Sequence, residues 1–152
     1  MSIKLKYLII LITLLFFTET VKSENKILFK INDQIITSID LLNEINYLKA
    51  TNNEFKNTNE IQSYEIAKNS LIREKIKEIE LINLIDKIEV DDEILNKIIQ
   101  NNFNYLNIKT LSDFNIYFKK NNINPLDVKK KISIELLWNQ LIFSKYKDKI
   151  KI

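Results

Sequence analysis

The hydrophobic pattern first predicts a β-hairpin over residues 27–37 that runs directly into a helix. Ile27–Ile31 and Gln34–Thr37 are apolar or β-branched and have strand length, and Asn32-Asp33 between them suits a two-residue turn. Thr37 begins a capping-box pattern with Asp40, so a helix is expected over Ser38–Thr51. A hairpin of this size is marginal alone. It therefore needs helices to cover it, or a strand from elsewhere to pair with it.

Four further helices are predicted by apolar residues at helical spacing and by residues that cap helix ends. The longest is expected over residues 60–87, where a wide apolar arc indicates contacts on more than one side. Asp91 is a good N-cap for the next helix, and Thr110 with Asp113 forms a second capping-box pattern. Asn124-Pro125 begins the last helix, which is expected to reach about Lys147. The polar residues 52–59 predict a loop.

The end of the chain, residues 148–152, alternates lysine or aspartate with isoleucine, which is the period of a strand. The expected fold is therefore mainly α: a five-helix domain with a small N-terminal β-hairpin and a C-terminal strand. Because no internal repeat or linker divides the sequence, residues 24–152 are expected to form one domain.

Residues 1–23 have the pattern of a secretory signal peptide. Lys4 and Lys6 precede an apolar run over residues 7–17, and cleavage is expected between Ser23 and Glu24. This predicts a periplasmic protein. The alternative is an uncleaved N-terminus that anchors the chain to the membrane, although the run is shorter than the ~20 residues that span a bilayer.

The composition argues against several kinds of chemistry. The chain contains no histidine, glycine or cysteine, so it lacks the commonest general base, glycine-rich phosphate loops and disulfides. Removing the three lysines and one glutamate of residues 1–23 from 23 basic and 20 acidic residues leaves a net charge of +1. A nucleic-acid partner is therefore not indicated, and no cofactor or metal is expected. We attribute the abundance of Ile, Lys and Asn, with Arg73 as the one arginine, to A/T-rich codons.

Three groups of residues invite a functional interpretation. The acidic triplet Asp91-Asp92-Glu93 is better explained as helix capping, because neighbouring helical residues do not face one another. The basic run Lys129-Lys130-Lys131 is interpreted as a solvated face. Aromatic residues between 103 and 118 are expected mainly in the core, although some are candidates to line an exposed groove.

Four segments of the sequence resemble the N-terminal module of the SurA family of periplasmic chaperones. They are KINDQIITSIDL (30–41), SLIREKIKEIELI (70–82), IEVDDEILNKII (88–99) and NINPLDVKKKISIELLWNQLI (122–142). Their order and spacing match the family over nearly all of residues 24–152. Two departures are Asp86-Lys87 and Asn121-Asn122, which stand where the family usually has glycine at helix ends. Asparagine tolerates the left-handed conformation there.

The resemblance implies a chaperone that holds unfolded outer-membrane proteins. In the family this module is followed by parvulin-type prolyl isomerase domains, which the sequence lacks, so no enzyme activity is expected. Binding of extended segments is expected in an apolar groove between the helices and the strands, with open strand edges at residues 27–37 or 149–152 adding backbone hydrogen bonds. The predicted client-contact residues are Tyr47, Tyr64, Phe103, Phe114, Phe118 and Trp138.

Two alternatives remain open at this point. In the first, the chain is a structural or dimerisation subunit that is completed by a strand from another chain. A homodimer would then form through open strand edges. In the second, the chain is the non-catalytic half of a split peptidyl-prolyl isomerase whose catalytic domain is a separate polypeptide.

Overall fold

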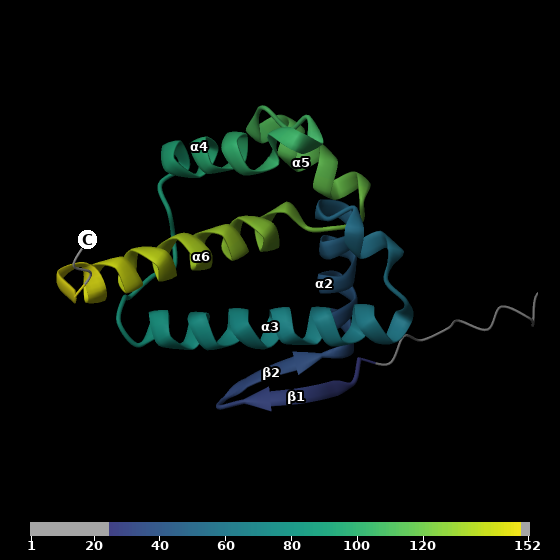
Figure 1. Ribbon diagram of the computed structural model, residues 1–152, viewed down its shortest axis with the longest axis horizontal. Helices are drawn as coiled ribbons and strands as arrows, with labels where there is room; N and C mark the ends of the chain where they lie inside the picture. The colour runs from purple at the N-terminus through teal and green to yellow at the C-terminus, as the bar shows by residue number, and fades with distance from the viewer. Residues whose placement is uncertain (1–24, 150–152) are drawn as a thin grey trace, which may run out of the picture.

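The computed structural model describes residues 25–149, which form a mainly helical fold with a small antiparallel hairpin, as predicted (Figure 1). The signal peptide predicted over residues 1–23, with cleavage between Ser23 and Glu24, lies outside the described residues. In chain order the main elements are β1 (Ile27–Ile31), β2 (Gln34–Thr37), α2 (Ser38–Thr51), α3 (Glu60–Ile82), α4 (Asp92–Phe103), α5 (Leu111–Lys120) and α6 (Pro125–Tyr146). Short 3₁₀ turns are η1 (Glu54–Asn57), η2 (Asn104–Leu106) and η3 (Lys147–Lys149).

The hairpin has the predicted strands and the predicted turn. Ile31 pairs with Gln34 and Phe29 pairs with Ile36, and the register shifts between Ile27 and Phe29. Ile36 is fully buried against the helices, because alternate residues of a strand point to opposite faces. One face of the hairpin therefore belongs to the core.

Asparagine supplies the left-handed backbone that this glycine-free chain needs. The three described residues with positive φ are Asn32 in the hairpin turn, Asn107 after η2 and Asn122 after α5. At Asn122, φ is 58°, and the amide of the next residue, Ile123, donates to the Phe118 carbonyl at 2.9 Å. This is a Schellman ending, in which the positive φ turns the chain back to satisfy the last carbonyls of the helix.

The predicted helix starts are confirmed. Thr37 and Asp40 form both bonds of a capping box, as do Thr110 and Asp113. Asp91 accepts from the Glu93 amide at 2.8 Å, and α6 begins with Asn124 as its N-cap and proline in its first turn. A side chain that accepts from a first-turn amide replaces a hydrogen bond that the helix itself does not supply. For that reason, these starts are fixed locally.

One predicted helix end is wrong, and the predicted C-terminal strand is not confirmed. Helix α3 ends at Ile82 rather than Lys87, because the amides of Leu84 and Ile85 both donate to the Leu81 carbonyl and tighten the last turn. The C-terminal strand predicted over residues 148–152 does not begin at Asp148, since Lys147–Lys149 form a 3₁₀ turn that continues α6. The rest of that segment, residues 150–152, lies outside the described residues.

The elements stack as hairpin, α3, α6 and then α4 with α5, while α2 runs across them at one end (Figure 1). One core cluster joins the hairpin to α2 and α3 through Ile36, Leu41, Ala67 and Leu71. A second gathers α4, α5 and the start of α6 around Phe103, Phe114 and Phe118, whose ring centroids lie 4.7–5.7 Å apart. Because Leu41 and Ala50 lie in different clusters, α2 connects the two cores.

Replacing Asn122 by glycine is expected to stabilise the fold. Glycine adopts φ near 58° without the steric penalty of a side chain, so Asn122→Gly should raise the free energy of unfolding by up to about 1 kcal/mol. Chemical denaturation followed by circular dichroism measures the change. The matched control is Asn121→Gly, because Asn121 has φ −92° and its side-chain amide donates to the Tyr117 carbonyl. That control should destabilise, and equal effects of the two substitutions would contradict the explanation.

Candidate functional site

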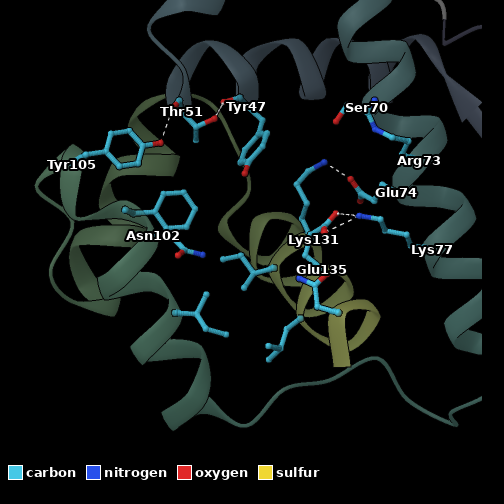
Figure 2. Close-up of a pocket in the computed structure, with 15 residues that line it drawn as sticks. Tyr47, Thr51, Ser70, Arg73, Glu74, Lys77, Asn102, Tyr105, Lys131 and Glu135 are labelled. Atoms are coloured by element: carbon cyan, nitrogen blue, oxygen red, sulfur yellow. Dashed lines mark hydrogen bonds and ion pairs between the residues drawn. The ribbon is translucent and has the colours of Figure 1, made fainter. Parts of the chain in front are cut away.

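A cavity of about 510 Å³ lies between α2, α3, α4 and α6 (Figure 2). Helix α3 contributes a polar wall, α6 contributes charged and apolar residues, and α4 with η2 closes the opposite side. The lining residues used below are Tyr47, Ser70, Arg73, Glu74, Lys77, Ile98, Asn102, Phe103, Lys131, Ile132, Glu135, Leu136 and Asn139. Since Arg73, Asn102 and Asn139 are all exposed, the cavity is open to solvent.

Lys131 joins three helices beside this cavity. Its Nζ lies 2.7 Å from a carboxylate oxygen of Glu44 on α2 and also bonds to the Glu74 carboxylate on α3. The side chains of Lys131 and Glu74 are less than one-fifth exposed, and that of Glu44 is almost fully buried. Burial lowers the pKa of Lys131, but the two carboxylates outweigh it and raise the pKa overall. Lys131 therefore remains charged inside the fold.

Further ion pairs continue along α3 and α6. Lys77 bonds to both oxygens of Glu135, at 2.5 and 2.8 Å. Glu78 is buried and receives Lys130 at 2.5 Å and Lys75 at 2.9 Å. Burial raises the pKa of Glu78, but the hydrogen bonds from Lys130 and Lys75 outweigh it and lower the pKa. These pairs hold the two helices side by side, and Lys77 and Glu135 among them line the cavity.

Tyr47 connects the ionic residues to the aromatic core. Its ring stacks on Phe118 with centroids 6.2 Å apart. The Nζ atom of Lys131 lies 5.0 Å from the centroid of the same Tyr47 ring. Burial raises the pKa of Tyr47 to about 12. At neutral pH the phenol is therefore uncharged and supplies an apolar face and a hydroxyl to the cavity wall.

The six predicted client-contact residues occupy different environments. Phe103, Phe114 and Phe118 are at most 5% exposed and form the aromatic core, which leaves almost no surface for a client in this conformation. Tyr47 and Phe103 both line the cavity. Tyr64 is half-buried against the hairpin cluster, and Trp138 is half-buried on α6, so the fold does not bring these two into the same site.

Several cavity residues were missed by the sequence analysis. Lys131, interpreted as part of a solvated basic face, is largely buried between two carboxylates. Its position in a run of three lysines conceals this, because only a contact with another helix distinguishes it from its neighbours. Arg73 was attributed to codon usage, yet it lines the cavity. Its residue type could have marked it as a candidate functional residue, since every other basic residue is lysine.

The groove expected between helices and strands is filled. Ile36 packs there with Ala67 and Leu71, and Phe29 and Tyr64 cover them. Exposed apolar residues are found instead on several elements, among them α3, α5, α6, the hairpin and the start of α2. We call those of the hairpin and the start of α2, Ile27, Ile35, Ile39 and Leu42, the hairpin–α2 patch; its members are 41–67% exposed.

None of the helices within residues 25–149 combines the length and apolar character that a membrane span requires. Over the same range, no three acidic side chains gather closely enough to hold a metal ion. Comparison of the chain with protein-family models, with curated proteins and with solved structures finds no match.

Replacing Lys131 by methionine is expected to lower the free energy of unfolding by about 3–5 kcal/mol, because it leaves the Glu44 and Glu74 charges without their cation. Thermal or urea denaturation measures the loss. Lys129→Met is the control: Lys129 lies on the same helix and makes no side-chain ion pair within residues 25–149. The triple substitution Lys131→Met, Glu44→Gln and Glu74→Gln should recover part of the loss. Similar effects of Lys131→Met and Lys129→Met would contradict the assignment.

Proposed function

We propose that this chain is an exported, non-enzymatic chaperone module that holds unfolded polypeptide, with clients of the outer-membrane protein type. The resemblance to the SurA family motivates the proposal. The observation that carries it is the hairpin–α2 patch, which combines exposed apolar side chains with strands that have unpaired edges. A chain that folds with such surface available is suited to bind segments that have not yet buried their own.

The patch offers side-chain burial to an extended client. Ile27 is 67% exposed and Leu42 is 54% exposed. Covering about 100 Å² of such surface contributes about 2.5 kcal/mol before the entropy cost of ordering the client. A contact of this strength is weak and reversible. That suits holding, because a client must later leave to fold elsewhere.

The hairpin also offers backbone hydrogen bonds. Within the described residues β1 and β2 pair only with each other, so each strand keeps one edge without a neighbouring strand. An extended segment that adds to such an edge gains main-chain hydrogen bonds whatever its sequence. Backbone recognition of this kind explains how one module would accept many different clients.

Holding predicts that the protein suppresses aggregation of a denatured outer-membrane porin diluted from urea, measured by light scattering at stoichiometric ratio. The double substitution Ile39→Asn and Leu42→Asn should reduce suppression, because it removes two apolar contacts of the patch. Ile116→Asn is the control, since Ile116 on α5 is 64% exposed but lies outside the patch. Absence of suppression by the unsubstituted protein would overturn the proposal.

The unpaired strand edges also favour a second candidate, in which a strand from another copy completes the module. This predicts a tight homodimer, measured as mass by light scattering on the purified protein across a dilution series. Placing proline at an edge amide of β1 or β2 should then dissociate the dimer. A monomer at all concentrations would exclude this candidate and leave the edges available to clients.

A further inference from the structure

Four polar side chains on the cavity wall make no hydrogen bond or ion pair with another residue of the described range, 25–149. They are Ser70 and Arg73 on α3, Asn102 on α4 and Asn139 on α6. The other cations of the cavity are engaged: Lys77 pairs with Glu135, and Lys131 pairs with Glu44 and Glu74. The Arg73 guanidinium is thus the cavity cation that no carboxylate within residues 25–149 neutralises. Figure 2 shows Ser70 and Arg73 together on the α3 side of the cavity and Asn102 on the opposite side.

The arginine at position 73 limits which class of ligand suits the cavity. A guanidinium presents a planar fork of N–H donors that matches two oxygens of a carboxylate or of a phosphate, whereas a lysine ammonium acts as a point charge. The neighbouring acidic groups do not compete for it, since Glu74 and Glu135 are held by lysines. An anion with two oxygens in one plane therefore fits this position best.

The other residues that line the cavity would not be contacted by a simple anion, so the ligand must carry further groups. Asn102 and Asn139 each supply an amide with both a donor and an acceptor, which is the complement of a peptide group. Ile98, Ile132 and Leu136 provide apolar surface in the same cavity. A volume of about 510 Å³ lies within the range of about 300–1,000 Å³ that is usual for ligand sites. The ligand must therefore carry a carboxylate, a peptide group and an apolar side chain together.

We propose that this cavity binds the C-terminal end of a polypeptide. Arg73 binds the terminal carboxylate, the asparagine amides bind the last peptide group, and the terminal apolar side chain packs against Ile132 and Leu136. Inorganic phosphate is a poorer match, because its higher charge meets one unpaired cation and the apolar wall stays unused. A fatty acid leaves the amides unused. The inference rests on the proposed function in one respect, namely that the bound chain is unfolded.

Fluorescence anisotropy with a fluorescein-labelled octapeptide ending in leucine tests this site. The peptide with a free carboxylate should bind at least about tenfold more tightly than the same peptide with a terminal amide, because the charge-assisted bond is lost. Arg73→Gln should abolish this preference. Arg73→Lys, which keeps the charge and loses the fork, should retain only part of it.

Lys120→Gln is the matched control. It removes the same charge from an exposed position on α5 that does not line the cavity, so the preference should be unchanged. Circular dichroism of each variant verifies that the fold is intact. N-acetyl-leucine should displace the peptide more effectively than octanoate, which separates a chain end from a free amphiphilic acid.

Equal affinity for the acid and amide peptides, a preference that survives Arg73→Gln, or displacement by octanoate as effective as by N-acetyl-leucine would each overturn the inference. The aggregation assay separates it from the proposed function. If the protein suppresses porin aggregation but does not prefer the acid peptide, only the proposed chain-end site is rejected. If the protein prefers the acid peptide but does not suppress aggregation, the chain-end site is supported and the proposed holding function is rejected.

Discussion

The packing of α2, α3 and α6 depends on one buried cation, Lys131. Its contacts with Glu44 and Glu74 fix where α6 lies against the other two helices, because a buried charge that moves away from its partners is strongly destabilising. The net stability that such a pair contributes is small, since desolvation offsets much of the attraction. The ion pairs that continue along α3 and α6 extend the same constraint. They keep polar groups between these two helices, and the open cavity lies directly beside them.

The two proposals use different parts of the molecule, and the packing explains why both parts are available. Tight apolar packing is concentrated in two clusters, one under the hairpin and one around the phenylalanines of α4 and α5. Between them, ion pairs from Lys77, Lys130 and Lys131 link α3 and α6, alongside the buried Leu81 and Ile134 of these helices. The cavity with Arg73 lies there. The outer side of the hairpin lies beyond the first cluster, and Ile35, Ile39 and Leu42 remain 41–54% exposed.

Local signals predicted most of the fold, but they did not predict the end of α3 or which residues stay exposed. The capping residues Thr37, Asp91, Thr110 and Asn124 fixed four helix starts, because a cap acts on amides within its own turn. The end of α3 was wrong, since its apolar pattern continues past Ile82 while the backbone turns toward α4. The aromatic residues 103, 114 and 118 were predicted both as core and as client contacts, and helical spacing alone does not separate an inward face from an exposed groove.

What the sequence determined by itself is the set of elements: their periodicity, their caps and the asparagines that replace glycine where φ is positive. These depend on interactions between residues a few positions apart. The tertiary structure alone decided which of three consecutive lysines is buried, that Arg73 lines a cavity with two asparagine amides, and which apolar residues stay exposed. Those outcomes depend on how α6 is placed against α3, which brings together side chains more than fifty residues apart.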